Sequence, residues 1–207
     1  DIQGRDAAAF LNHVYANGFT KLPIGRARYG LMLREDGMVM DDGTTARLGE
    51  THYVMTTTTA NAVGVFRHLE FCRQCLWPEL DVQLISITEQ YAQYAVAGPN
   101  ARCLLEKLID FGEDISNEAF PFMACREISI CGGVKARLSR ISFSGELASE
   151  TAVPSRYGDA MIRAPMAAGG GFDVTTYRHD ALGVTRLEKG LVPGNEFTSP
   201  TTPRRKG

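Results

Sequence analysis

The chain has 207 residues, of which 44% are hydrophobic and 22% charged, and its formal net charge is −2. This composition is typical of a globular protein, and the length allows one large domain or two small subdomains. The weak net charge argues against a nucleic-acid partner, and no apolar run approaches the roughly 20 residues of a membrane span. Since no charged-then-apolar leader opens the chain, we expect a cytoplasmic protein.

The first half of the chain combines one helix with a hairpin and a second helix. Asp6 is the expected N-cap of the first helix, whose apolar face would hold Ala7, Phe10, Leu11 and Val14. The later elements, in chain order, are hairpin strands at 29–33 and 38–40 about a turn at 35–37, a strand at 52–58, and a helix at 60–77.

The second half repeats this mixture of helices and hairpin strands. We expect one or two strands at 82–97, a helix at 101–109, a hairpin at 129–143, a helix at 155–168, a short strand near Phe172, and a helix at 179–189 with Gly190 as its C-cap. Hairpins outnumber βαβ units, so the fold class is α+β, with antiparallel sheets and packed helices. We expect one domain over 1–197, a subdomain boundary near 78–81, and an irregular tail at 198–207.

Two adjacent carboxylates, Asp41 and Asp42, follow an apolar run on the second hairpin strand. Neighbouring residues of a strand point to opposite faces, so one carboxylate would face inward and lose water. Desolvation would raise the proton affinity of that carboxylate and favour a nearby cation. The pattern alone is also compatible with an ordinary polar hairpin end.

A third acid, Glu146, follows a Ser-Gly turn in the run SFSGE. A carboxylate in such a place can project into a cleft, where it would accept two parallel hydrogen bonds from an amidine-like edge. A solvated turn glutamate is the ordinary alternative.

Other patterns argue for packing rather than chemistry. Cys72 and Cys75 have redox or zinc spacing, but they lie within an expected helix where both would share the apolar face. The four histidines are scattered, so no metal site is expected. The glycine runs do not form a dinucleotide fingerprint, so any flavin or NAD would bind another domain or chain.

Four segments in order resemble one family, the glycine-cleavage T-protein (aminomethyltransferase) family, which includes the folate domains of sarcosine and dimethylglycine oxidases. They are RYGLMLREDGMVMDD, AVAGPNAR, RISFSGELASE and RLEKG. The resemblance implies the aminomethyltransferase folate-binding fold, here incomplete, because the family's first strand and its C-terminal β-barrel have no counterpart. Segments such as LEFCRQCLWPELDVQ look most like the alpha subunits of heterotetrameric sarcosine oxidases.

The resemblance also implies roles for individual residues. Tetrahydrofolate is the implied cofactor, with Asp42 the favoured acid near its reactive nitrogen and Asp41 the fallback. Glu146 would bind the pterin, and Thr44 and Thr56 would contribute polar contacts. The implied activity is capture of the one-carbon unit from oxidative demethylation of sarcosine as 5,10-methylene-tetrahydrofolate, with other oxidase subunits as partners and a sarcosine-derived iminium as substrate.

Two alternatives remain open, a glycine-cleavage-type aminomethyltransferase and a non-catalytic folate-binding or assembly module, and three departures from the family pattern bear on the choice. Leu182 replaces an arginine of aminomethyltransferases, which argues against a free-standing glycine-cleavage role. Leu191 lies where assembly-type members carry a cysteine, which argues against a non-catalytic assembly module. Ser149 replaces an aromatic residue that often follows the Gly-Glu-x-Gly run, which alters the packing expected around the pterin.

Overall fold

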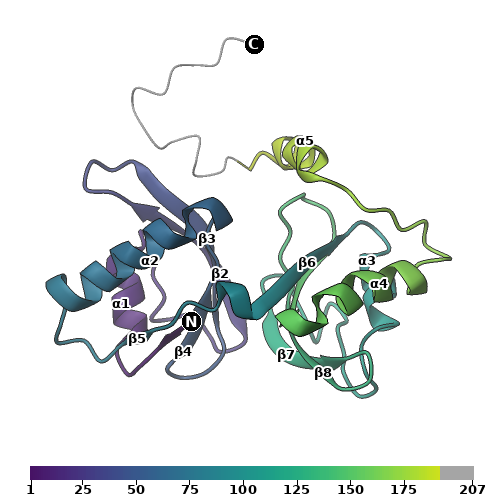
Figure 1. Ribbon diagram of the computed structural model, residues 1–207, viewed down its shortest axis with the longest axis horizontal. Helices are drawn as coiled ribbons and strands as arrows, with labels where there is room; N and C mark the ends of the chain where they lie inside the picture. Colours follow the sequence, from purple (N-terminus) through teal and green to yellow (C-terminus); the bar gives the residue numbers. More distant parts are fainter. Residues whose placement is uncertain (192–207) are drawn as a thin grey trace, which may run out of the picture. The chain divides into compact units, whose positions relative to one another are not determined.

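The computed structural model describes residues 1–191, which form two compact units, Asp1–Ser86 and Ile87–Leu191 (Figure 1). The expected boundary segment 78–81 lies within the first unit. The expected irregular tail at 198–207 lies outside the described residues.

The first unit contains an antiparallel sheet in the order β2-β3-β4-β1-β5. Its elements are β1 (Ile2–Gln3), α1 (Ala7–Val14), β2 (Arg26–Leu33), β3 (Val39–Arg47), β4 (His52–Met55), α2 (Ala62–Phe71) and β5 (Gln83–Leu84). The second unit contains an antiparallel sheet in the order β6-β9-β8-β7. Its elements are β6 (Tyr91–Ala97), α3 (Ala101–Glu106), β7 (Cys125–Ile130), β8 (Val134–Ser139), β9 (Ala148–Pro154), α4 (Gly158–Ala168) and α5 (His179–Lys189). The predicted α+β class with antiparallel sheets is confirmed.

Helix α1 buries the apolar face that its spacing predicts, namely Ala7, Phe10, Leu11 and Val14. An isolated helix this short would be only marginally stable in water. Burial of its apolar face against the sheet supplies most of its stability. Asp6 is the N-cap residue, but its side chain does not cap the helix. Its carboxylate instead accepts a hydrogen bond from the backbone N–H of Asp81, at 2.9 Å, and so holds the segment before β5.

The predicted hairpin is formed by β2 and β3, with Gly37 at a φ of 79° in the turn. The pairing shifts register between Met32 and Leu33, where β3 carries one extra residue. Such a bulge bends a strand and re-aims the side chains that follow it. Asp41 and Asp42 come directly after this irregularity.

Gly43 of β3 allows the segment that follows β4 to pass close to this strand. A side-chain Cβ at Gly43 would lie 2.0 Å from the carbonyl oxygen of Thr56, so only glycine fits there. The residues that follow β4 therefore lie directly against β3. This contact brings the backbone of Thr58 within reach of Asp41.

The core of the second unit lies between its sheet and α4. Leu138 of β8, Val153 of β9 and Met161 of α4 are each at most 3% exposed and belong to one cluster. The hairpin predicted at 129–143 forms from β7 and β8, so it begins and ends about four residues earlier than expected. This sheet supports the turn that carries Glu146.

Two expectations are wrong. Cys72 is buried but Cys75 is exposed, because residues Cys72–Leu76 form a π-helical turn that rotates Cys75 away from the core. No strand forms near Phe172, whose backbone N–H instead closes a turn onto the carbonyl of Gly169. The centroid of the Phe172 ring lies 4.3 Å from the ammonium nitrogen of Lys107.

We expect Gly43→Ala to lower the free energy of unfolding by about 1–3 kcal/mol, because the added methyl group must displace the Thr56 carbonyl. Urea denaturation measures the change. Gly18→Ala is the matched control, since its Cβ would meet nothing closer than the Asn12 side chain at 4.0 Å. Equal effects of the two substitutions would contradict the role of the close approach.

Candidate functional site

Strand β3 places its two adjacent carboxylates on opposite faces of the first sheet. Asp41 is 6% exposed and pairs with the buried Met32 of β2. Asp42 is half-buried and pairs with Leu31. The expectation that one of the two carboxylates faces inward is met by Asp41.

Asp41 is tied to the segment that follows β4. One carboxylate oxygen accepts the backbone N–H of Thr58 at 3.1 Å, and the other accepts the side-chain amide of Asn61 at 3.4 Å. The same amide donates to the carbonyl of Met40 at 3.0 Å. Burial raises the pKa of Asp41, and the hydrogen bonds from Thr58 and Asn61 offset part of that rise. These contacts hold the segment after β4 against the Asp41 end of β3.

Asp42 lies on the more open face and has a phenol as its partner. The Tyr29 hydroxyl donates to its carboxylate at 2.6 Å, the short distance expected when the acceptor is charged. Burial raises the pKa of Tyr29, and the Asp42 carboxylate raises it further. Tyr29 therefore stays neutral at physiological pH and holds the Asp42 carboxylate in one orientation.

Thr44 and Thr56 form a hydroxyl pair beside Asp42. Thr44 follows Asp42 by two residues and so shares its face of β3. The Thr56 hydroxyl donates to the Thr44 carbonyl at 3.1 Å, so in the 3.0 Å contact between the two hydroxyls Thr44 is the donor. The Thr44 oxygen then offers acceptor capacity on the same face as Asp42.

Glu146 belongs to the second unit, in the connection between β8 and β9. The turn before it is held by the Ser142 hydroxyl, which accepts the Gly145 N–H at 2.9 Å, and by the Lys189 ammonium, which donates to the Ser142 carbonyl. Gly145 has a φ of 91°, a conformation that glycine adopts easily. Glu146 is exposed, and within residues 1–191 nothing hydrogen-bonds to its carboxylate.

The structure thus joins Asp42, Thr44 and Thr56 on one unit and places Glu146 on the other. Sequence reasoning missed two residues of the site, Tyr29 and Asn61. The register of the hairpin could have indicated Tyr29, because it lies opposite Thr44 and diagonally from Asp42. Nothing in the sequence pointed to Asn61, whose role depends on the path of the chain after β4.

The described residues contain neither a metal-binding cluster nor a membrane-spanning helix. No group of three or more His, Cys, Asp and Glu side chains within residues 1–191 could hold a metal ion. In the same part of the chain, no helix is long and apolar enough to span a membrane.

The fold and the site define a mixed α+β domain whose first unit presents a hydrogen-bonded aspartate on its sheet. The model of the family described as the GCVT N-terminal domain matches residues 1–207. The chain therefore belongs to the GCVT N-terminal domain family. A solved structure, the glycine cleavage system aminomethyltransferase T from Bartonella henselae, superposes with a TM-score of 0.80 at 27% identity, over 98% of this chain and 51% of that chain.

The curated relatives include sarcosine oxidase alpha subunits and aminomethyltransferases. Sarcosine oxidase subunit alpha of Rhizobium meliloti (strain 1021) is 56% identical over 100% of this chain, which spans 21% of that protein. The same subunit of Corynebacterium sp. (strain P-1) is 48% identical over equal shares. An aminomethyltransferase of Thermus thermophilus is 33% identical over 98% of this chain and 54% of the relative. The predicted resemblance to sarcosine oxidase alpha subunits is confirmed, and the chain spans about a fifth of their length.

We expect the free energy of unfolding of the Asp41→Asn variant, relative to that of the unsubstituted chain, to increase as pH rises from about 4 to 7. Because burial raises the pKa of Asp41 above its unfolded value near 3.9, the folded state binds that proton more tightly. The stability contributed by protonated Asp41 is therefore lost as pH rises above about 4. Urea denaturation of both proteins at several pH values measures the difference, and a difference independent of pH would contradict a desolvated Asp41.

Proposed function

We propose that this chain is the tetrahydrofolate-binding module of a sarcosine-oxidase-type enzyme. It would capture the one-carbon unit released by oxidative demethylation of sarcosine as 5,10-methylene-tetrahydrofolate. The whole-chain similarity to sarcosine oxidase alpha subunits and to aminomethyltransferases supports this proposal. The observation that carries it is the half-buried Asp42 carboxylate, held by Tyr29 at 2.6 Å on the open face of the sheet.

Side chains on each of the two units have the chemistry to bind a part of folate. Glu146 offers two carboxylate oxygens that no described group occupies, and the amidine-like edge of a pterin can donate two parallel hydrogen bonds to such a carboxylate. The Thr44 oxygen offers an acceptor beside Asp42. We therefore assign Glu146 to the pterin and Thr44, with Thr56 behind it, to a polar contact.

Asp42 would act through its charge and through its proton affinity. Bound folate supplies the nucleophilic nitrogen that accepts the one-carbon unit. A fixed carboxylate stabilises positive charge on a neighbouring cationic iminium and can accept a proton at its oxygen. Tyr29 keeps that carboxylate oriented, so little reorganisation is needed when charge develops.

The oxidation that produces the iminium would take place elsewhere. We assign flavin and NAD to other domains or subunits of a multi-subunit enzyme. The sarcosine-derived iminium is the proposed small-molecule substrate of this module. The chain covers 21% of the Rhizobium meliloti (strain 1021) subunit, which leaves ample length for such domains.

A second candidate is a glycine-cleavage-type aminomethyltransferase. The fold similarity at a TM-score of 0.80 favours it, since that structure is an aminomethyltransferase. This function would require a lipoyl carrier protein in place of a flavin partner. Turnover with an aminomethyl-lipoyl carrier, and none with sarcosine in the presence of the partner subunits, would select it.

We expect Asp42→Ala, in the assembled enzyme, to slow methylene-tetrahydrofolate formation by about 10²-fold or more, the usual effect of losing a positioned acid–base group. Flavin reduction by sarcosine should be unchanged, and formaldehyde should appear instead. Stopped-flow absorbance and product analysis measure the two steps.

The control for this substitution is Glu35→Ala, which removes an exposed carboxylate from the turn of the same hairpin. It should leave both steps unchanged. Equal loss of both steps in Asp42→Ala would refute the assignment of Asp42 to one-carbon transfer.

We expect Glu146→Gln to weaken tetrahydrofolate binding by roughly 10- to 150-fold, because a hydrogen bond to a charged acceptor contributes about 1.5–3 kcal/mol. Calorimetric titration measures this against a starting affinity in the micromolar range, about −8 kcal/mol. Glu118→Gln, at another exposed glutamate of the same unit, should bind normally. Unchanged affinity in Glu146→Gln would remove the proposed pterin anchor.

A further inference from the structure

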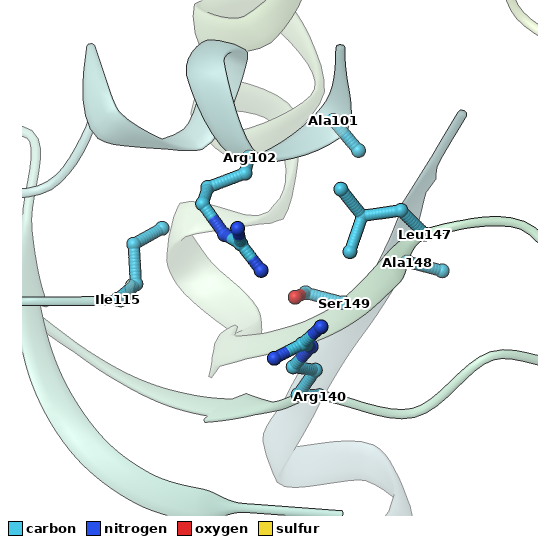
Figure 2. Close-up of a pocket in the computed structure, with 7 residues that line it drawn as sticks. All are labelled: Ala101, Arg102, Ile115, Arg140, Leu147, Ala148 and Ser149. Atoms are coloured by element: carbon cyan, nitrogen blue, oxygen red, sulfur yellow. The ribbon is translucent and has the colours of Figure 1, made fainter. Parts of the chain in front are cut away.

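Two arginines without an acidic partner among residues 1–191 converge on a small pocket in the second unit. Figure 2 shows the Arg102 and Arg140 side chains directed into this pocket, with Ser149 between them. The other lining residues are all apolar, namely Ala101, Ile115, Leu147 and Ala148. No lining residue is an acid, so the pocket presents two positive charges and one hydroxyl.

Each guanidinium has only a neutral hydrogen-bond acceptor within the described part of the chain. Arg102 donates to the side-chain oxygen of Asn117 at 2.6 Å, and Arg140 donates to the carbonyl of Phe120 at 3.0 Å. None of the ion pairs formed within residues 1–191 includes either side chain. Since a guanidinium carries five N–H donors, both retain donors for a further acceptor.

The electrostatics of the pocket favour an anion. Burial lowers the pKa of Arg140, and the neighbouring positive charge of Arg102 lowers it further. Two like charges in a partly desolvated place repel each other, and an anion between them removes that repulsion. Planar guanidinium groups also match the two oxygens of a carboxylate better than a point charge does.

The size of the pocket limits the ligand. Its volume is about 10 Å³, which is close to the room that one water molecule needs. Ser149 is 9% exposed and lies on β9, and its short side chain leaves this space open while offering a hydroxyl donor. The pocket therefore has room for about one oxygen atom of a small oxyanion and none for a ring.

We propose that Arg102, Arg140 and Ser149 form a binding site for a small carboxylate, held by the two guanidinium groups and the serine hydroxyl. This site uses residues of the second unit other than Glu146, and it can be tested in the absence of folate. Occupation by a carboxylate would tie α3, which carries Arg102, to the segments that carry Arg140 and Ser149.

Hydrogen exchange of the 207-residue chain, without folate, tests the site. Formate is the probe, and chloride at equal ionic strength is the reference. At about ten times the dissociation constant, we expect amide exchange in residues 101–106 and 147–149 to slow by about tenfold, because opening then requires release of the anion. Arg102→Gln and Arg140→Gln should each lose this response while exchange in β7 and β8 stays slow, which shows an intact fold.

Arg163→Gln is the matched control, since it removes an exposed arginine from α4 of the same unit. It should respond to formate as the unsubstituted chain does. A formate effect no larger than that of chloride would overturn the proposal, as would an equal response in the two pocket variants. A response to phosphate without one to formate would contradict the assignment to a carboxylate. Because no folate is present, these results are independent of the Asp42 and Glu146 tests.

Discussion

The candidate site depends on the alternation of side chains along β3 after its bulge. Alternation sends Asp41 to the buried face and Asp42 to the open one, so neighbouring identical side chains acquire different properties. A slip of one residue would exchange the two faces and would separate Tyr29 from its present partner. The bulge between Met32 and Leu33 and the close approach at Gly43 fix this register.

The buried Asp41 is linked to the face that carries Asp42 through the backbone of the segment after β4. Asp41 accepts from Thr58 and Asn61 and so holds the chain after β4 against β3. That chain delivers the Thr56 hydroxyl to Thr44, on the face that Asp42 shares. The desolvated Asp41 carboxylate thus helps to hold the segment that places Thr56 beside Thr44.

The second unit carries Glu146, Arg102 and Arg140 on segments that pack against its own hydrophobic core. Its sheet supports the Glu146 turn and part of the nearby pocket, since Arg140 lies in the β8–β9 connection and Ser149 on β9, while Arg102 lies on α3. The rigid strand and the helix α3 hold these side chains while leaving their heads exposed or half-buried. Such placement suits binding of an anion or a polar edge more than it suits stability, since exposed charges add little to a fold.

The sequence alone determined the hairpin about Gly37, the buried face of α1, the α+β class and the family resemblance. These features follow from local periodicity, turn chemistry and short motifs, which one stretch of chain carries by itself. Tertiary structure decided which aspartate is buried, that Tyr29 holds Asp42, that Asn61 supports Asp41, and that Arg102 meets Arg140. Each of these depends on the packing of residues distant in sequence, and the exposed Cys75 shows how one π-helical turn overrides a regular spacing.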